Sequence, residues 1–494
     1  MHTGTSVFGL QLLVILLFNT CSFSQPWKEH GHLVVSENGH FLEHADGTGF
    51  FWLGGTAWML PRLDPDQVDR YLKDRAEKGF NVIQFTANNM GRVNYLGELP
   101  FRGKGRPWNQ VLPNESYWEH IDYIIDRAAE LGLYIAFFAW WGNDAGDPGW
   151  REGKETRQHF ADPDVHNYLY GKYLGDRYND RPNMIWVGAG ECHKPAGVMF
   201  PDRQRPLGKR HRNRLTAVIR GIRETEPGIH LYTIHPVSFL SSSEDFHHEQ
   251  WLDFNMIQSH AVPEYIVPLV WADWNLEPAK PSLVAEGWYE AENRLYSRWT
   301  GMKTVHDDTI HEAWKQRYQA YWAVFAGGFG FTYGHRNIWR MEDDSGNPGR
   351  LPQHVLDAPG AASLVHLKSL IESKPVHSRV PDPDLVSPGT RGRTSGLSPD
   401  LRIATRALDG SWAFIYTTRG SLIRVRMNRL ATGQADAFWY SPDCGKWTAE
   451  GSQHDEKIPF RSMIPSGQAA GDCYFDPPGN PCNGNDRVLV LEIH

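Results

Sequence analysis

The sequence has few cysteines, no long apolar run and no strong excess of either charge, and each shortage excludes a class of protein. Only 5 of the 494 residues are Cys, too few for a disulfide-built scaffold in a chain of this length. The 50 Lys and Arg against 58 Asp and Glu give a formal net charge of −8, which argues against nucleic-acid binding, because that needs clustered basic residues. No CxxC, HExxH or G-x-S-x-G motif occurs, so we expect no metal, no cofactor and no esterase chemistry.

Apolar and aromatic side chains are abundant enough for a large core. Hydrophobic residues make up 40% and charged residues 22% of the chain, the proportions of a soluble globular protein rather than a disordered one. Aromatic residues reach 13%, with 20 Trp. We expect most of these rings in the core, although indole faces also pack against the C–H faces of sugars, so the surplus also fits a carbohydrate site.

Residues 1–24 are typical of a secretory signal. No Lys, Arg, Asp or Glu precedes Lys28, and an apolar run extends from Leu12 to Phe18. A membrane-spanning helix needs about 20 apolar residues, so this run is too short to span and fits a signal cleaved before Gln25. We expect an exported protein, periplasmic or secreted, without stable membrane insertion. A lipid anchor at Cys21 is the alternative.

The four remaining cysteines allow one local pairing. Cys473 and Cys482 flank a loop rich in Pro and Gly, and in an oxidising compartment they are candidates for a short disulfide. The pairing of Cys192 and Cys444 does not follow from the sequence.

Strand and helix patterns alternate from residue 50 to residue 373. Apolar runs predict the strands, and helical spacing with caps such as Asp64-Pro65 predicts the helices. The predicted strands are 50–57, 81–87, 133–141, 183–190, 230–235, 254–260, 282–286 and 328–333, and the predicted helices are 64–78, 116–131, 164–178, 207–226, 264–274, 309–325 and 361–373. Strands that are apolar throughout indicate a parallel sheet covered on both faces. We therefore predict an α/β fold, with a (β/α)8 TIM barrel over residues 27–375.

The composition changes after the barrel. Residues 376–400 are rich in Pro, Ser and Gly and are predicted to be a linker. From residue 401 to residue 494 short alternating runs such as WAFIYTT, DAFWYS and RVLVLEI are separated by Gly, Pro and Asp turns. This pattern predicts a small antiparallel β-sandwich.

Polar and aromatic residues follow the ends of the predicted barrel strands. In a TIM barrel the chemistry lies at the carboxyl ends of the strands, so these residues are the candidates for the site. In strand order they are Thr56, Asn88, Trp141 and Asn143, Glu191, His235, His260, Glu286 and Trp288, and Tyr333 and His335.

Two of these candidates, Glu191 and Glu286, are carboxylates on the fourth and seventh strands. These strands face each other across a barrel, so both side chains can reach one central cleft. A carboxylate pair with aromatic, amide and imidazole neighbours is the constellation of a glycosidase. A Glu at a strand end can instead cap a helix or pair with an Arg, and His235 and His260 can instead be core histidines. The combination favours a functional site over these structural roles.

Several segments resemble a known family, in order along the chain. They are GHLVVSENGHFLEHADGTGFFWLGGTAW, YLKDRAEKGFNVIQ, WLDFNMIQSH and FGFTYGHRNIW. These look like the domain of unknown function 4038, the catalytic barrel of glycoside hydrolase family 140, the apiosidase-like group. The segment NDRVLVLEI resembles the collagen-binding-like β-domain that follows this barrel. The resemblance implies a retaining TIM-barrel glycosidase that acts on apiose-containing plant polysaccharide.

The resemblance also implies roles for the two carboxylates. The fourth-strand motif, similar to W-x-x-G-G-D, ends here at Glu191, so the acid/base is expected there with Glu in place of Asp. The seventh-strand motif, similar to G-E-P-x-Y-E, places the nucleophile at Glu286, with Gly287 where the family has Pro. The first-strand motif G-D-T-A-W keeps Thr56 and Trp58 but has Gly55 in place of Asp. We expect these departures around the cleft to change the sugar that is recognised.

The expected mechanism is a double displacement. Glu191 protonates the leaving oxygen, Glu286 attacks the anomeric carbon, and Glu191 then activates water. The difference in pKa is expected to come from Glu191 lying in the more apolar place or near the charge of Glu286. The partner is a plant or algal polysaccharide or oligosaccharide. The alternatives are a glycosidase for another sugar and a non-catalytic carbohydrate- or matrix-binding surface protein.

Overall fold

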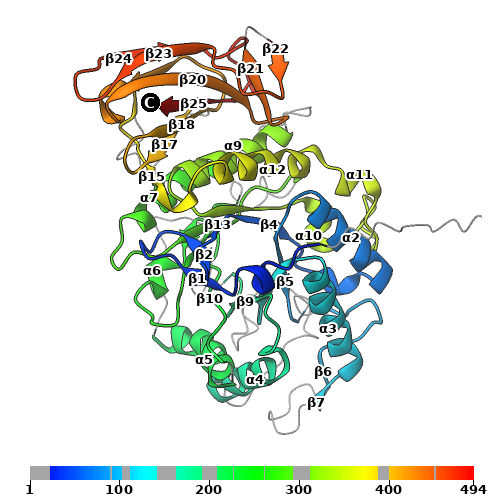
Figure 1. Ribbon diagram of the computed structural model, residues 1–494. Helices are drawn as coiled ribbons and strands as arrows, with labels where there is room; N and C mark the ends of the chain where they lie inside the picture. The colour runs from blue at the N-terminus through cyan, green and yellow to red at the C-terminus, as the bar shows by residue number, and fades with distance from the viewer. Residues whose placement is uncertain are drawn as a thin grey trace, which may run out of the picture.

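The computed structural model describes residues 23–88, 92–102, 112–141, 163–191, 209–225, 227–260, 262–292, 312–387, 400–449 and 452–494. These residues form a barrel and a smaller β-domain. The β-domain lies against the barrel side formed by α9 (Glu312–Phe325) and α12 (Pro359–Glu372) (Figure 1). The predicted signal falls almost entirely outside the described residues.

The barrel sheet contains the predicted strands. Its members are β4 (Trp52–Thr56), β5 (Val82–Thr86), β8 (Tyr134–Phe138), β9 (Met184–Val187), β10 (Tyr232–Thr233), β12 (Asn255–Gln258), β13 (Ser282–Glu286) and β14 (Gly330–Tyr333). They are parallel neighbours in the order β10-β9-β8-β5-β4-β14-β13-β12. A short strand that the sequence did not reveal, β11 (Leu240–Ser241), pairs antiparallel with β12.

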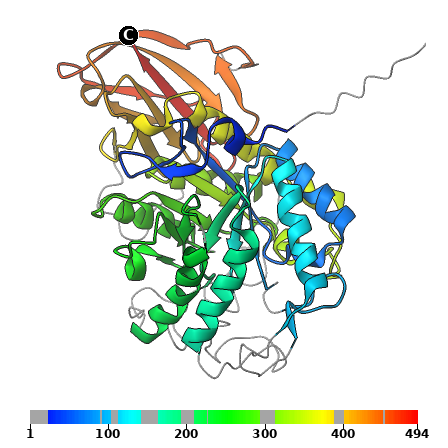
Figure 2. The ribbon, with the colours of Figure 1, turned by 60° about the horizontal axis from the view of Figure 1, so that its bottom comes forward.

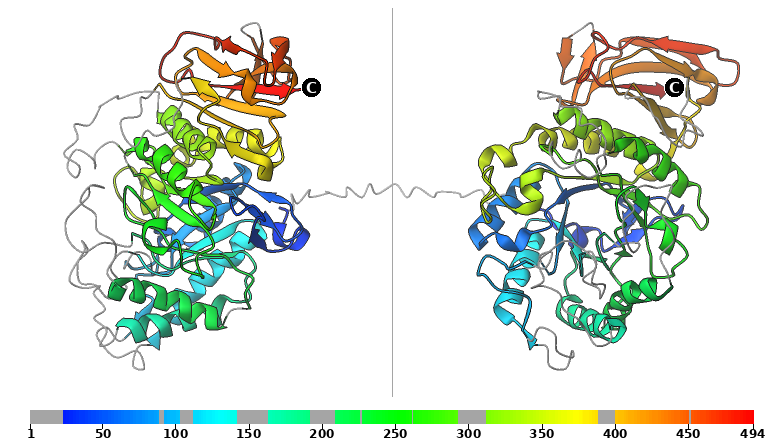
Figure 3. Two further views of the ribbon diagram at one scale, coloured as in Figure 1. Left: turned by 90° about the vertical axis from the view of Figure 1, so that its left-hand side faces the viewer. Right: turned by 180° about the vertical axis from the view of Figure 1, so that it is seen from behind.

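The ring closes between β10 and β12 through three hydrogen bonds rather than a strand ladder. The backbone N–H of Asp253 donates to the Tyr232 carbonyl at 2.9 Å. The Asp253 carboxylate accepts from the Tyr232 N–H at 2.7 Å, and the Thr233 hydroxyl donates to the Phe254 carbonyl at 2.7 Å. Seen from behind, the strands surround a common axis and the helices lie outside them (Figure 3). The predicted TIM barrel is confirmed.

Helices follow the strands as predicted, within a few residues at each end. They are α2 (Pro65–Glu77), α3 (Glu115–Glu130), α4 (Pro163–Tyr178), α5 (Lys209–Thr225), α7 (Ile266–Trp274), α9 and α12. The start of α2 shows why. The Asp64 side chain accepts a hydrogen bond from the Gln67 N–H at 2.9 Å, which satisfies a free backbone donor of the first turn. Pro65 occupies the first turn, where its fixed φ suits a helix.

Short elements fill the connections. They are α1 (Pro26–Glu29), η1 (Leu60–Arg62), β6 (Phe101–Arg102), β7 (Leu112–Pro113), α6 (Ser243–Phe246), η6 (Pro263–Tyr265), α10 (Arg336–Arg340), α11 (Gln353–Leu356) and η7 (Val376–Ser378). The N-terminal strands β1 (Leu33–Val35), β2 (Leu42–His44) and β3 (Gly49–Phe50) form an antiparallel sheet. Phe50 and Trp27 pack edge-on against Tyr134, the first residue of β8. This sheet therefore covers the amino ends of the strands, opposite the carboxyl ends (Figure 2).

A polar chain inside the barrel ties four strands together. The Trp52 indole donates to the Thr332 hydroxyl at 3.0 Å, which donates to the Gln84 side chain at 3.2 Å, and the Gln84 amide donates to the Ala285 carbonyl at 3.1 Å. Gly54 permits this packing, because a Cβ there would collide with the Trp52 indole and would lie 2.8 Å from the Thr332 hydroxyl. The chain fixes β4, β5 and β14 against β13 at Ala285, next to Glu286.

The C-terminal domain is built from two antiparallel sheets, as predicted. The larger contains β15 (Arg379–Pro381), β17 (Arg402–Ala407), β18 (Trp412–Thr417), β20 (Gly433–Ser441), β21 (Lys446–Ala449), β22 (Ser452–His454), β23 (Arg461–Ser466) and β25 (Arg487–Ile493), and the smaller contains β16 (Val386–Ser387), β19 (Ile423–Arg426) and β24 (Asp472–Phe475). A short helix, η8 (Met427–Arg429), follows β19. The first two strands lie inside the predicted linker 376–400, so the domain begins at Arg379 rather than at residue 401.

The two domains share a polar and aromatic interface. Arg317 of α9 makes two hydrogen bonds of 2.9 and 2.7 Å to Asp486, both side chains being buried. The Trp322 indole donates to the Thr418 hydroxyl at 2.9 Å. Core residues of both domains belong to one continuous apolar cluster. The β-domain is therefore packed onto the barrel rather than joined to it by a flexible segment.

The predicted short disulfide is absent. Cys473, on β24, and Cys482, on an exposed loop, both have free thiols, as does Cys444. Cys192 lies outside the described residues. No helix in the described ranges is long and apolar enough to cross a membrane.

Candidate active site

Glu286 is buried at the carboxyl end of β13. It has 4% of its surface exposed. The register between β12 and β13 shifts by one residue, so that Glu286 rather than Ala285 lies opposite Gln258. The Ser282 hydroxyl at the start of the strand faces Asp273 of α7, outside the sheet, and regular alternation would place Glu286 on that same face. The irregularity redirects Glu286 toward the barrel axis, a common use of a bulge near a functional site.

One oxygen of Glu286 is held by Tyr289, which is held in turn by Trp58. The Tyr289 hydroxyl donates to Oε1 of Glu286 at 2.7 Å. The Trp58 indole, two residues after β4, donates to the Tyr289 hydroxyl at 2.8 Å. Trp58 was expected near the site. Tyr289 was quoted only as part of a motif and was missed as a functional residue.

His235 lies beside the other oxygen of Glu286. Its Nε2 is 3.5 Å from Oε2, and the side chain is fully buried. The ring packs against Trp58, Phe138 and Trp141, with centroids 5.8, 5.6 and 6.0 Å away. Burial lowers the pKa of His235 to about 3, so the imidazole is neutral at ordinary pH. This neutral ring can donate a hydrogen to Glu286 without adding charge.

Glu191 and Trp141 are placed by the ends of β9 and β8. Trp141 forms a parallel bridge with Gly190, and a Cβ at Gly190 would collide with the Trp141 ring. The close approach therefore requires glycine just before Glu191. Glu191 itself has a φ of 44°, a left-handed conformation that is uncommon for a residue other than Gly, Asn or Asp.

The two carboxyl groups interact electrostatically. Burial first, and the charge of Glu191 second, raise the pKa of Glu286 to about 8, while the Tyr289 hydrogen bond and the neighbouring Gln258 amide act in the opposite direction. Glu191 therefore lies close enough to Glu286 for its charge to act on it. The structure places Glu286 rather than Glu191 in the more apolar surroundings, which is the reverse of the expected difference.

Three further candidates lie at the ends of neighbouring strands. His260 follows β12, has a φ of 48° and directs its backbone N–H toward the Glu286 carbonyl at 3.4 Å. Burial lowers its pKa to about 4. Thr56 ends β4, Asn88 lies two residues after β5, and both are buried. Gln258, the partner of Glu286 in register, was not among the sequence candidates because it lies inside an apolar strand.

Trp288 is held on the loop after Glu286. Its backbone N–H donates to the Gln319 side chain at 2.7 Å, and its indole N–H donates to the Glu292 carbonyl at 3.2 Å. The ammonium of Lys315 lies 5.0 Å above the ring. A Cβ at Gly287 would lie 2.8 Å from the same Gln319 oxygen. The Gly287 that replaces the family's Pro therefore leaves room for Gln319 beside the loop.

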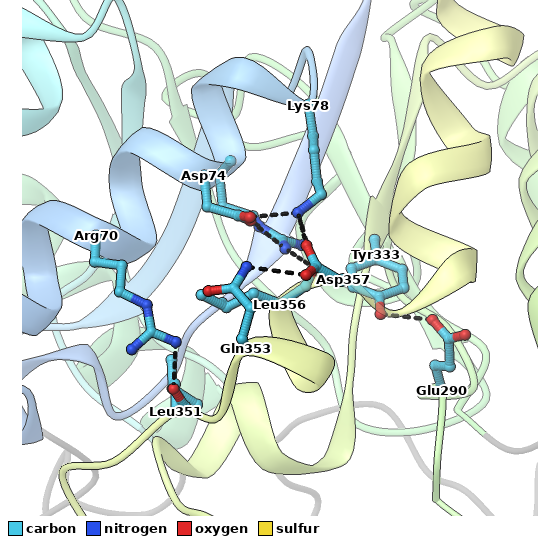
Figure 4. Close-up of polar contacts among 10 residues, drawn as sticks. Arg70, Asp74, Lys78, Glu290, Tyr333, Leu351, Gln353, Leu356 and Asp357 are labelled. Carbon is cyan, nitrogen blue, oxygen red and sulfur yellow. Dashed lines mark hydrogen bonds and ion pairs between the residues drawn. The ribbon is translucent and has the colours of Figure 1, made fainter.

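Tyr333 and His335 serve contacts outside the carboxyl pair. The Tyr333 hydroxyl donates to Glu290 at 2.6 Å (Figure 4), and its ring faces Phe80 at 6.0 Å. His335 caps α10 by accepting from the Asn337 N–H at 3.1 Å, and burial lowers its pKa to about 3. Neither is brought to Glu286, so neither is retained among the proposed sugar contacts.

Gly55 also faces away from the carboxyl pair. A Cβ at this position would lie 3.3 Å from the Tyr71 hydroxyl and 3.6 Å from Phe80 and Ile83, in the layer between the sheet and α2. An Asp here would therefore reach Tyr71 rather than the carboxyl pair. The expectation that Gly55 alters the same cleft as Glu191 is corrected.

Asn143, which was expected to contact the sugar, lies outside the described residues. Within the described ranges, no group of three or more His, Cys, Asp or Glu side chains is arranged to hold a metal ion.

Comparison with known proteins identifies the class defined by this barrel and site. A solved structure titled "Glycoside hydrolase" is 28% identical with a TM-score of 0.76, and the match covers 95% of this chain and 98% of that chain. A glycoside hydrolase family 5 protein from Bacteroides vulgatus ATCC 8482 is also 28% identical with a TM-score of 0.76, covering 96% and 95%. No curated protein sequence matches the chain. The chain is a glycoside hydrolase with a TIM-like barrel.

The family is defined by the sequence of the barrel. Residues 36–378 match the family model described as "Apiosidase-like, catalytic domain", and residues 380–492 match the model of a collagen-binding-like domain described for a collagenase. The chain belongs to the apiosidase-like family.

Proposed function

We propose that this chain is a retaining glycosidase that cleaves a glycosidic bond in a complex plant or algal polysaccharide, with Glu286 as nucleophile and Glu191 as acid/base. The observation that carries the proposal is the surroundings of Glu286, which is buried at a strand end, hydrogen-bonded by Tyr289, flanked by neutral His235 and coupled to Glu191. The family's name for its catalytic domain supports an apiose-like or related sugar as the group released.

The proposed reaction has two displacements. Glu191 donates its proton to the leaving glycosidic oxygen while an ionised Glu286 attacks the anomeric carbon, which gives a glycosyl-enzyme. Glu191 then removes a proton from water, and the water attacks the anomeric carbon and releases Glu286. Trp141 is partly exposed beside His235 and Trp58, and its indole face is the proposed stacking surface for the sugar ring.

The proton must be on Glu191 when the bond breaks. Burial and the charge of Glu191 favour the protonated form of Glu286 in the absence of substrate. Positive charge that develops at the anomeric carbon stabilises the ionised form of Glu286. Bond breaking in the sugar therefore favours the ionised form of Glu286 that the nucleophilic attack requires.

A different sugar specificity is the second candidate, and Glu191 favours it. The family has Asp at this position, so the carboxyl group extends further from the strand here by about one C–C bond, roughly 1.5 Å. Such a displacement is large on the scale to which catalysis is sensitive. We also propose export through residues 1–24, which is consistent with a polysaccharide substrate outside the cell.

The first experiment is a panel of plant and algal polysaccharides, with products identified by mass spectrometry and anomeric configuration read by NMR. On the substrate found, Glu286→Gln should lose activity by several orders of magnitude while keeping the fold, because the covalent route disappears. Asp273→Asn is the matched control, since Asp273 is also a buried carboxyl with a raised pKa but lies on α7, away from the strand ends. Full activity of Glu286→Gln would refute the proposal.

Azide assigns the two roles. With an aryl glycoside of the identified sugar, Glu191→Ala should regain turnover with azide and give a glycosyl azide of retained configuration, and Glu286→Ala should give the inverted azide. The opposite pattern would exchange the two roles. A crystal structure should place the two carboxyl carbons about 5–5.5 Å apart if configuration is retained and about 6.5–9.5 Å apart if it is inverted.

A further inference from the structure

We propose that Glu290 is a positioning residue that holds the proposed nucleophile Glu286 in place through Tyr289, and that Tyr333 and Gly360 fix Glu290 for this task. The inference rests on the proposed function for its effect on turnover. Its structural part, the placement of the Tyr289 hydroxyl, can be tested separately.

The carboxylate of Glu290 is turned away from Glu286 and buried, with 3% of the residue exposed. Its Oε2 accepts from the Tyr333 hydroxyl at 2.6 Å (Figure 4), and its Oε1 accepts from the Gly360 N–H at 3.0 Å. Gly360 lies in the first turn of α12, where backbone N–H groups and the helix dipole favour a negative charge. A Cβ at Gly360 would overlap the Glu290 carboxylate, so the contact requires glycine there.

The backbone of Glu290 is also fixed on both sides. Its N–H donates to the Gly334 carbonyl at 2.9 Å, and its carbonyl accepts from the Arg336 N–H at 3.0 Å. Two side-chain and two backbone hydrogen bonds thus tie this residue to the end of β14, the start of α10 and the start of α12.

Tyr289 is confined by the same arrangement. It directly precedes Glu290, and a Cβ at Gly334 would collide with its ring. Its hydroxyl is between the Trp58 indole and Oε1 of Glu286. With the Glu290 backbone fixed and the ring against Gly334, the hydroxyl is held where it reaches Glu286. A shift of Glu290 away from α12 would move this hydroxyl and lengthen its hydrogen bond.

A side chain that only filled space at residue 290 would not need these hydrogen bonds. A buried carboxylate is costly unless its hydrogen bonds are met, and an apolar side chain at residue 290 could fill the space between β14 and α12. The carboxylate is useful because its directional hydrogen bonds fix where residue 290, and with it Tyr289, lies. Catalytic groups must be held to within about 0.5 Å of their working positions.

The test measures the pKa of Glu286 in the full chain by NMR, with 13C at the glutamate side-chain carboxyls and the signal assigned by its loss in Glu286→Gln. The Tyr289 hydrogen bond favours ionised Glu286, so Tyr289→Phe should raise the pKa of Glu286 by about one unit. Tyr333→Phe and Gly360→Ala should raise it in the same direction, with kcat lowered more than KM is changed. Gly360→Ala keeps the Tyr333 hydroxyl and presses on Glu290 and on Cγ of Gln316, and it provides the test where Tyr333→Phe does not fold.

Tyr440→Phe is the matched control. It removes a buried hydroxyl that donates to the His366 carbonyl of the same helix α12 at 2.9 Å and has no contact with Glu290, so the pKa of Glu286 should not change. The inference is overturned if Tyr289→Phe raises the pKa of Glu286 but Tyr333→Phe and Gly360→Ala do not. Failure of the proposed function has a different signature, since Glu286→Gln would then remain active whatever the NMR titrations give.

Discussion

The hydroxyl of Tyr289 donates a 2.7 Å hydrogen bond to Oε1 of Glu286, three residues earlier at the end of β13. The other polar groups facing Glu286 are the amide of Gln258 and the neutral imidazole of His235. Within the part of the chain that the structure describes, no Lys or Arg forms an ion pair with Glu286. Among the described residues only uncharged donors face its charge, which is why burial and Glu191 together raise its pKa.

Removal of the Tyr289 hydroxyl should slow catalysis. A hydrogen bond to a charged group contributes about 1.5–3 kcal/mol, so we expect Tyr289→Phe to lower kcat about 10- to 100-fold. The acidic limb of the pH–kcat profile should move to higher pH, because Glu286 ionises less readily. Steady-state kinetics across pH would measure both effects. Tyr170→Phe, which loses a 3.0 Å hydrogen bond to the Ala139 carbonyl, should leave both unchanged.

Neutralising the partner carboxyl should lower the pKa of Glu286. The charge of Glu191 raises that pKa, and Glu191→Gln removes the charge while keeping a similar shape. We expect the NMR titration of Glu286 in this variant to shift downward from about 8, with burial still keeping it above the ordinary glutamate value. An unchanged titration would mean that the two groups do not share a site.

Asp273 should make folding stability fall with pH in a defined window. Its carboxyl is buried against the hydroxyls of Ser241, Ser243 and Ser282, and burial raises its pKa from 3.8 to about 6. The folded state therefore keeps a proton that the unfolded chain has lost, so stability is highest below about pH 4 for this group and decreases up to about pH 6. The whole effect is on the order of 3 kcal/mol.

The measurement for Asp273 is chemical unfolding across pH. The difference in unfolding free energy between the wild type and Asp273→Asn should change between about pH 4 and pH 6 and be constant on either side, because the amide does not titrate. The variant should lose less stability than the wild type as pH rises. A difference that stays constant across the whole range would exclude a raised pKa at Asp273.

Most of the barrel could be predicted because local signals agree with the fold. The cap at Asp64-Pro65 and the apolar runs of the strands specify α2 and the sheet without long-range information. The carboxyl-end rule then predicted Glu286, Glu191, His235 and Trp141, and the family motif added Trp58; the structure places these residues near one another. No local sequence pattern marks Gln258 or Tyr289 as a site residue, because the role of each depends on which side chains face it from other elements.

Two errors have one cause, the direction in which a side chain points from its strand. Tyr333 and Gly55 are register partners on β14 and β4, and both face outward, whereas Thr332 and Gly54 face the barrel interior. Strand alternation could have assigned Tyr333 to the outer face from the sequence. The same rule would have failed at Glu286, where the register shift with Gln258 reverses the face. Bulges of this kind are set by neighbouring strands and are not visible in one strand's sequence.

The substitution Glu191→Asp, which restores the residue of the family motif, should lower activity without lowering stability. Glu191 has a φ of 44°, a conformation that Asp tolerates better than Glu, so Glu191→Asp should leave the unfolding free energy equal or slightly higher. The same change withdraws the carboxyl by about 1.5 Å, and we expect activity on the native substrate to fall about 10-fold or more. Gly55 faces Tyr71 and not the carboxyl pair, so Glu191 is the departure from the family motif that bears on the sugar. We expect the wild type to act weakly or not at all on apiosyl linkages. Thermal unfolding and product analysis of both proteins on the same substrate would measure this. Efficient apiose release by the wild type, with Glu191→Asp equally active, would show that the backbone compensates for the longer side chain and that the family's substrate is retained.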